Sequence, residues 1–345
     1  MRRSVIVAVL AYFSDTPEGR PMRVAPEMTK RSIATLVLCG AAGCSASGSG
    51  AVGDVGGTTW TDGQRLSGSV AIAAGNAVSI APGAAIGVEA GTTITVAGTL
   101  TAHGASATHA KIAGSGWTGI VVAPGGVLSL DGVDIAGAST ALDVQKGAKA
   151  EYDDGNIDGA AMPFDVEAGG ALTTRRSTVT HAQGSSQIAG AFTASRLDYD
   201  AGFNSGIVTM DPAATLSVED STLHGSGPSG DFLVSEGAAT FHVAYTDISN
   251  VHCAFHFDSI TSFDISYTRI HQDAYGFMLY GSGGGGPRMV AHSNIDNSPG
   301  LAYDTAGQNG PIVFDHCYVT GSANPGDAVT TTNPQTTPVP GTGPR

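Results

Sequence analysis

Hydrophobic and polar residues alternate in short runs along most of the chain. Similar segments recur, each with apolar first and third positions, two polar positions, usually a Ser or Thr, and then an aliphatic residue. The clearest copies are LSLDGVDI at 128–135, LTTRRSTV at 172–179, LSVEDSTL at 216–223, FHVAYTDI at 241–248 and FDISYTRI at 263–270. Alternation with a period of two predicts strands with one buried face, and these runs are too short for helices.

The last aliphatic residue of this segment recurs at intervals of 18 to 26 residues, most often 22 to 25. We assign it to Ile135, Ile157, Val179, Leu197, Leu223, Ile248, Ile270, Ile295 and Val319. A second apolar pair follows it in several copies, at Leu142/Val144, Phe164/Val166, Phe255/Phe257 and Phe277/Leu279. Upstream, apolar pairs recur every eight residues, so three sides of about eight residues make one coil of about 24.

This period predicts an all-β fold, a three-sided solenoid with 22–25-residue coils of the right-handed parallel β-helix type. One coil cannot bury its apolar face alone, whereas a stack buries a continuous column. A jelly roll or a propeller is the alternative all-β fold, but neither predicts this period. The chain resembles the pectate-lyase-like superfamily over roughly residues 60–322, and the passage GTLTAHG…WTGIVV, with Trp117, is similar to its opening coils.

The amino-terminal part resembles a bacterial lipoprotein signal. A basic pair at 30–31 precedes a short apolar run at 32–38, and AAGC at 41–44 is similar to the lipobox, with Ala41 where the family usually has Leu. The resemblance implies lipidation of Cys44 and export to the bacterial cell envelope, at the outer membrane or cell surface. The alternative is an ordinary signal peptide cut nearby without lipid.

Four parts of the chain are therefore expected. Residues 1–43 are an upstream extension and signal peptide, residues 44–59 a flexible tether, residues 60–322 the β-helix and residues 323–345 a disordered Pro/Thr-rich tail. No other apolar run approaches the ~20 residues of a membrane span, so membrane attachment is expected through lipid only.

Composition narrows the partners. Charged residues are 13% of the chain and the formal net charge is -14, which disfavours nucleic acid as a partner. Glycine is abundant, at 49 of 345 residues, and aromatic residues are few, at 6%. At 41%, hydrophobic residues are too frequent for a disordered chain. No cofactor is expected, and the expected partner is a polysaccharide or another surface protein.

One column of aromatic residues is a candidate ligand-binding surface. Tyr245, Tyr267, His292 and His316 each lie three residues before the last aliphatic residue, in four consecutive coils. Rings stacked at this spacing offer a flat apolar surface to sugars. The alternative is a ring stack that only stabilises the coils.

A second column contains candidate catalytic residues. Asp143 and Asp165 occupy the outward position of one strand face in adjacent coils, and His256, Met278 and Tyr303 continue that face. Two adjacent carboxyl groups can divide the acid and nucleophile roles in glycoside cleavage. However, the chain lacks the Asn-Thr-Asp, Asp-Asp and Gly-His-Gly motifs of polygalacturonases, so the alternative is a pair of ordinary solvated residues.

The stretch HCAFH at 252–256 has donors that zinc sites use. The repeat places His252 and Cys253 in a turn and His256 on the following strand, so no metal site is predicted. The coils of Cys253 and Cys317 lie three apart, beyond the ~7 Å Cα–Cα limit of a disulfide. Cys317 shares a column with small Ser and Thr residues and is expected in the core.

The sequence favours a non-enzymatic exported surface lipoprotein, whose β-helical rod serves interaction or adhesion. The alternative is a carbohydrate-binding or polysaccharide-degrading protein, a lyase or hydrolase, on the same scaffold. A convergent acid–base site would discriminate between the two classes, and the sequence contains no clear one.

Overall fold

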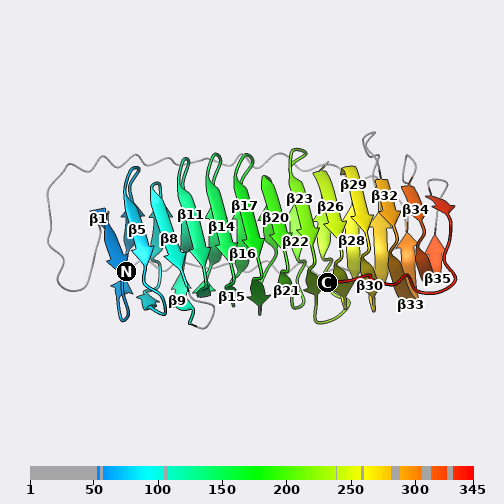
Figure 1. Ribbon diagram of the computed structural model, residues 1–345, viewed down its shortest axis with the longest axis horizontal. Coiled ribbons are helices and arrows are strands. Elements are labelled where there is room, and N and C mark those ends of the chain that lie inside the picture. Colours follow the sequence, from blue (N-terminus) through cyan, green and yellow to red (C-terminus); the bar gives the residue numbers. More distant parts are fainter. Residues whose placement is uncertain are drawn as a thin grey trace, which may run out of the picture. The chain divides into compact units, whose positions relative to one another are not determined.

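The computed structural model describes residues 53–54, 57–104, 108–237, 239–257, 260–280, 288–304, 312–324 and 329–345. Within these ranges every regular element is a β-strand. The described residues contain no helix long and apolar enough to cross a membrane. The strands stack side by side as a parallel β-solenoid of about 11 turns with coils of about 22 residues (Figure 1). The predicted parallel β-helix is therefore confirmed. The proposed signal and Cys44 lie outside the described residues.

Each coil contributes strands to three parallel stacks, which we call the first, second and third faces; the first and second faces belong to one 23-stranded sheet and the third is a 13-stranded sheet. The first face contains β1 (Gly53–Asp54), β4 (Ser69–Ile72), β7 (Thr93–Val96), β10 (Gly119–Val122), β13 (Thr140–Val144), β16 (Met162–Val166), β19 (Ser186–Ile188), β22 (Ile207–Thr209), β25 (Leu233–Ser235), β28 (Cys253–Phe257) and β31 (Tyr275–Leu279). The second face contains β3 (Arg65–Leu66), β6 (Ala85–Val88), β9 (Ala110–Trp117), β12 (Val133–Ala138), β15 (Asn156–Asp158), β18 (Thr178–Thr180), β21 (Asp198–Asp200), β24 (Thr222–His224), β27 (Asp247–Ser249) and β30 (Arg269–His271). Two longer strands, β33 (Asn294–Asp304) and β35 (Tyr318–Asn324), continue both of these faces.

The third face contains β2 (Thr58–Trp60), β5 (Ala77–Ile80), β8 (Thr99–His103), β11 (Val127–Asp131), β14 (Lys149–Asp153), β17 (Ala171–Arg175), β20 (Ala191–Ser195), β23 (Thr215–Glu219), β26 (Ala239–Ala244), β29 (Ile260–Ser266), β32 (Arg288–Ala291), β34 (Ile312–Asp315) and β36 (Val329–Thr332). Along the chain a third-face strand leads into the second face and then the first, as β11, β12 and β13 do.

The strand register agrees with the predicted aliphatic column except in one coil. Ile248 pairs with Ile270, which is fully buried as the repeat requires. In the exceptional coil Val179 pairs with Tyr199, so the assignment of Leu197 to this column is wrong. Leu197 is also buried, two residues earlier, which is why the apolar pattern alone suggested it.

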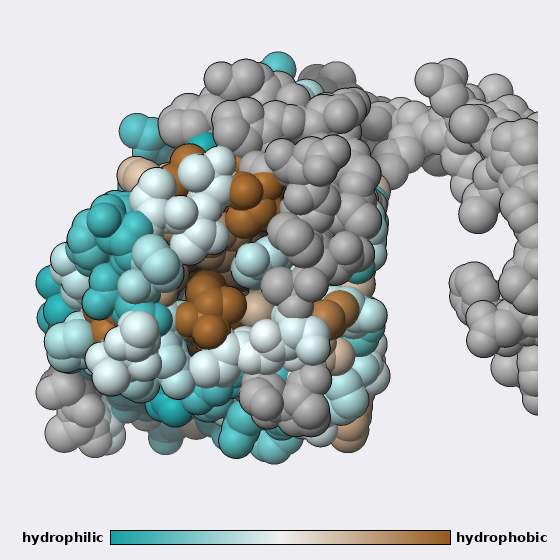
Figure 2. Space-filling model, turned by 90° about the vertical axis from the view of Figure 1, so that its right-hand side faces the viewer, coloured by the Kyte–Doolittle hydropathy of each residue, from teal (hydrophilic) through white to brown (hydrophobic). Residues whose placement is uncertain are grey.

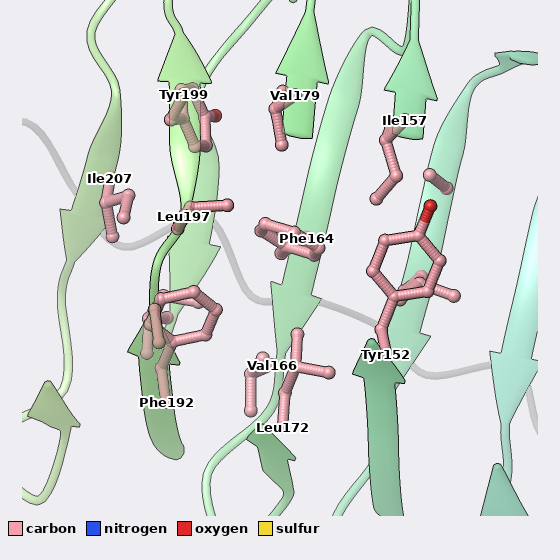
Figure 3. Close-up of a cluster of buried hydrophobic side chains, with 14 of the residues drawn as sticks. Tyr152, Ile157, Phe164, Val166, Leu172, Val179, Phe192, Leu197, Tyr199 and Ile207 are labelled. Atoms are coloured by element: carbon pink, nitrogen blue, oxygen red, sulfur yellow. The ribbon is translucent and has the colours of Figure 1, made fainter. Parts of the chain in front are cut away.

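Large side chains fill the column between the three faces (Figure 3). The rings of Phe164 and Phe192, from the first and third faces, lie 5.5 Å apart. The hydroxyl of the buried Tyr152 donates to the carbonyl oxygen of Val133 at 2.8 Å, so its polar atom is satisfied inside the core. Burying one such large apolar side chain contributes about 1.5–3 kcal/mol, and the stacked coils repeat this gain along the solenoid.

The bend between the third and second faces repeats one backbone conformation. A left-handed residue with φ between 48° and 55° occupies it in successive coils, at Asp154, Arg176, Arg196, Asp220, Tyr245, Tyr267, His292, His316 and Asn333. The next residue in most of these coils is a buried Ser or Thr whose hydroxyl donates to the carbonyl two residues earlier, as in Thr246 to Ala244 at 2.9 Å. Cys317 occupies the same position with its thiol directed to Asp315 O, so its predicted core role is confirmed.

Both ends of the described solenoid differ from expectation. β1 and most of β2 lie within the segment predicted as a tether, and each pairs with the strand one coil later. At the other end, residues 329–345 lie within the predicted disordered tail, but β36 pairs with β34 and the following residues lie on the coils. Figure 2 shows this end along the axis, with hydrophobic residues near its centre.

Candidate functional site

The four rings of the predicted ladder form one continuous stack. Tyr245 and Tyr267 lie 4.9 Å apart with an angle of 3° between their planes. Tyr267 and His292 are 5.1 Å apart, and His292 and His316 are 4.9 Å apart, so the contact continues through four coils. Each ring is half-buried. The parallel register explains this geometry, because equivalent residues of adjacent coils lie one strand spacing apart.

The chain's own end lies across this ladder. We call residues 335–345 the C-terminal strap; it returns along the coils, in red in Figure 1. The amide of Gly343 donates to Tyr267 O at 2.9 Å, and Asn294 exchanges hydrogen bonds with both backbone groups of Val339 at 3.0 and 2.8 Å. The strap therefore covers a polar side chain that is itself only 7% exposed.

Arg345, the last residue of the strap, contacts Tyr245, the first ring of the ladder. Its guanidinium carbon lies 3.6 Å from the centre of the Tyr245 ring, and its Nε donates to Asp220 at 2.9 Å. Hydrogen bonding to Arg345 lowers the pKa of Asp220 below its ordinary value. Asp220 and Tyr245 hold the same bend position in adjacent coils, so one guanidinium bridges a carboxylate and a ring.

The two carboxyl groups of the predicted catalytic column are register partners on β13 and β16. Burial, together with the charges of Asp165 and Glu167, raises the pKa of Asp143 to about 6. Asp143 Oδ1 is buried and, among the described residues, has no hydrogen-bond partner. A protonatable carboxyl beside a second one is a pair that acid catalysis can use.

His256 belongs to the same column but is far from these carboxyl groups. The column passes from Asp165 through Gln187, Val208 and Val234 before it reaches His256. At one strand spacing per coil, about 19 Å separates the two ends of that path. Beyond His256 the column continues through Met278 to Asp304, whereas Tyr303, which we expected there, pairs with the buried Phe277.

His256 instead joins a compact cluster with HCAFH neighbours. His256 Nδ1 lies 2.6 Å from Asp231 Oδ2, and His252 Nδ1 lies 2.8 Å from Asp231 Oδ1. The thiol of Cys253 is 3.3 Å from His252 Nδ1 and 3.9 Å from the sulfur of Met278. Donor atoms of Asp231, Cys253 and His256 all lie within 4.8 Å of one another.

The electrostatics of this cluster are set by one carboxylate. Burial raises the pKa of Asp231, but hydrogen bonds from His256 and His252 outweigh this effect and hold the pKa at about 2. Burial and the adjacent Asp231 charge raise the pKa of the Cys253 thiol well above its ordinary value. At neutral pH the cluster therefore contains an ionised carboxylate beside a neutral thiol.

A cavity of about 540 Å³ adjoins the cluster at the same corner of the coils. Its lining includes Asp273, Tyr275 and Asn297, and the ring centroids of Tyr275 and His252 lie 5.1 Å apart in a T-shaped contact. Burial raises the pKa of Asp273 to about 8, so this carboxyl is largely protonated at neutral pH. Neither Asp143 nor Asp165 lines this cavity.

The sequence pattern located the ladder but missed the cluster. The repeat predicts His252 and Cys253 in a turn and His256 on the following strand, and no metal site. Cys253 instead begins β28, the strand that carries His256. The structure corrects this reasoning, because Asp231 from the preceding coil reaches both imidazoles. The available signal was the period, since Asp231 lies one 22-residue coil before Cys253. The two described cysteines are free and buried, in agreement with the predicted absence of a disulfide between them.

Comparison with known proteins adds no further assignment: no family model, curated protein or solved structure matches the chain.

Proposed function

We propose that the protein is an exported lipoprotein whose β-helical rod is a non-enzymatic interaction scaffold, with the ring ladder as its binding surface. The observation that carries this proposal is the stack of four half-buried rings across consecutive coils, with an extended segment of the chain lying over it. A surface that accommodates the strap has the dimensions and hydrogen-bonding groups for another extended chain. Function in adhesion or surface interaction follows from export and this extended surface.

The chemistry of the ladder supports an interaction role over catalysis. Stacked rings provide apolar area and attract cations, as the contact between Arg345 and Tyr245 illustrates. The predicted catalytic residues do not form one site, because His256 contacts Asp231 rather than Asp143 or Asp165. A rod that presents a repeated surface can bind along its length without a reaction centre.

Membrane attachment is tested at Cys44. The Cys44→Ala variant should move from the membrane fraction to the soluble fraction, because a lipid group at this cysteine would supply the attachment. Cys39→Ala is the matched control and should leave the partition unchanged. Fractionation followed by immunodetection measures both variants. If Cys44→Ala stays with the membrane, the lipoprotein proposal fails.

Ligand binding is tested at the ladder. The soluble full-length Cys44→Ala protein is applied to a glycan array, and binding is compared with that of the additional double variant Tyr245→Ala/Tyr267→Ala. Loss of two stacking rings should weaken a ladder-bound glycan by at least about fivefold, since each aromatic contact contributes about 0.5–1.5 kcal/mol. Unchanged binding of an array ligand by the double variant would exclude the ladder as its site.

A polysaccharide hydrolase is the second candidate, and the raised pKa of Asp143 is the observation that favours it. Adjacent strands place the Asp143 and Asp165 backbones about 4.8 Å apart, which suits a retaining carboxyl pair. In this reaction Asp143 would be the acid and Asp165 the nucleophile. Reducing-sugar release from a panel of polysaccharides, abolished by Asp165→Asn, would establish this activity in place of the scaffold role.

A further inference from the structure

We propose that Asp231, Cys253 and His256 form a binding site for a thiophilic divalent metal ion of the zinc class. The three side chains offer a carboxylate, a thiol and an imidazole from two adjacent coils, and their donor atoms lie within 4.8 Å of one another. The site lies at the corner where the second face leads into the first face. It is independent of the ladder and of the proposed scaffold function.

The strand register fixes the geometry of these donors. β25 pairs with β28, so Asp231, two residues before β25, lies beside Cys253, two residues before Phe255. The buried Phe255 and Phe257 hold the backbone of β28 in place and direct His256 outward between them. The donors are therefore positioned by the core rather than by a mobile loop, which lowers the ordering cost of binding a metal.

The present hydrogen bonds place the donors close to coordination distances. Zinc bonds of about 2.0–2.3 Å put tetrahedral donor atoms about 3.3–3.7 Å apart. Asp231 Oδ2 and His256 Nδ1 are 2.6 Å apart, so they need to separate by about 1 Å to admit the ion. Side-chain rotation supplies this movement without a change in the strand register.

His252 and Met278 lie beside the three donors and influence which metal ions the site prefers. His252 Nδ1 lies 2.8 Å from Asp231 and 3.3 Å from the Cys253 sulfur, so it borders the site and holds the Asp231 carboxylate in position. The Met278 sulfur lies 3.9 Å from the Cys253 sulfur and adds a soft atom on the buried side. Sulfur and imidazole donors favour zinc, cobalt and copper, whereas calcium and magnesium prefer oxygen donors alone.

Binding exchanges protons for the metal ion. The Cys253 thiol loses its proton to solvent as the metal–sulfur bond forms, because the thiolate is the ligand. The His256 Nδ1 proton, which is donated to the ionised Asp231, is exchanged through solvent for a proton on Nε2 of the same ring, so a neutral imidazole releases no net proton. Nδ1 and the Asp231 carboxylate then bind the metal ion in place of their hydrogen bond. No oxidant or reductant takes part, and one proton is released for each thiol that coordinates.

The test uses the full-length Cys44→Ala protein after dialysis against a chelator. Titration with Co²⁺ should give one equivalent bound, with the near-ultraviolet charge-transfer absorption of a cobalt–thiolate bond, and Zn²⁺ should displace it. Mg²⁺ should not compete. In the Cys253→Ser variant the absorption should vanish and zinc affinity should fall at least about tenfold.

The matched control is Cys317→Ser, since Cys317 is also buried and serine already occupies its column in other coils. This variant should retain the absorption and the affinity. His256→Ala, at a position that is not part of the core, is the second variant and should also lose at least about tenfold in zinc affinity. Absence of stoichiometric Co²⁺ binding, or a thiolate band that persists in Cys253→Ser, would overturn the proposal and leave a purely structural Asp–His network.

Discussion

Tyr245 and Tyr267 hold a left-handed backbone conformation that bulky residues seldom adopt, with φ of 49° at both positions. This conformation costs about 1–2 kcal/mol at each residue other than glycine, because the Cβ atom crowds a backbone carbonyl oxygen. The following Thr246 and Thr268 offset it, because each hydroxyl donates to the carbonyl two residues earlier and closes the bend. The sequence predicted that the Ser/Thr column faces inward, whereas the left-handed bend is set by three-dimensional stacking and was not predicted.

Asp143 provides a residue-scale test that does not depend on catalysis. Its folded pKa of about 6 exceeds that of an unfolded aspartate, so the group opposes folding as it ionises. The protonated carboxyl makes its full contribution to the free energy of unfolding below about pH 4. That contribution is lost as the pH rises through 6. Asp143→Asn should therefore gain stability over the native protein between pH 4 and pH 7.

The gain at pH 7 should be about 1 kcal/mol, reduced from the full effect because solvent screens this half-buried group. Thermal unfolding measured at each pH follows the difference. Gln187→Asn is the control, since this neutral residue lies two coils further along the same column and should leave the pH profile unchanged. A pH-independent difference for Asp143→Asn would contradict the raised pKa.

At the scale of the strand, the period of the sequence determined which residues pair. Alternating apolar positions predicted the register of Ile248 with Ile270, because a shift by one residue would turn every buried side chain outward. The prediction was wrong at Leu197, where two apolar residues two positions apart both fit the alternation and only the neighbouring coils select Tyr199.

The same scale explains why the metal-ligating cluster was missed. Within one coil, His252 and His256 do lie on different elements, and the sequence argument considered only that coil. In a solenoid the nearest neighbours of a side chain lie one period away in sequence. Asp231 therefore contacts His252 although about one coil of sequence separates them. Candidate chemistry in such chains is better sought between coils than within a linear motif.

At the scale of the whole solenoid, the strap joins residues that are far apart in sequence, since Arg345 contacts Asp220, 125 positions earlier. Its composition, rich in Pro and Thr, predicted disorder because it contains few large apolar residues. The structure holds it through hydrogen bonds with Tyr267 and Asn294, and through Arg345 on Asp220. These contacts come from polar and backbone groups, which a search for apolar periodicity does not detect.

A strap supplied as a separate peptide should bind to the ladder of a protein from which the strap has been deleted. Deletion of residues 335–345 should lower the melting temperature, because it removes the hydrogen-bond partners of the buried Asn294, at a cost of about 1–3 kcal/mol, and also removes the Arg345 contacts. A labelled synthetic peptide of residues 335–345 should then bind the shortened protein and restore part of the lost stability. Fluorescence anisotropy measures the binding, and a thermal melt measures the recovery.

Single substitutions locate the contact. A peptide with Arg345→Ala should bind about fivefold more weakly, because it loses the ion pair with Asp220 and the cation–π contact with Tyr245. In the shortened protein, Tyr245→Ala should have a similar effect. Arg176→Ala is the matched control, because Arg176 holds the same bend position in a coil three turns before that of Tyr245 and should leave binding unchanged. A shortened protein that keeps its melting temperature and fails to bind the peptide would show that the strap makes no stabilising contact with the ladder, and the rings would then be open to other partners from the outset.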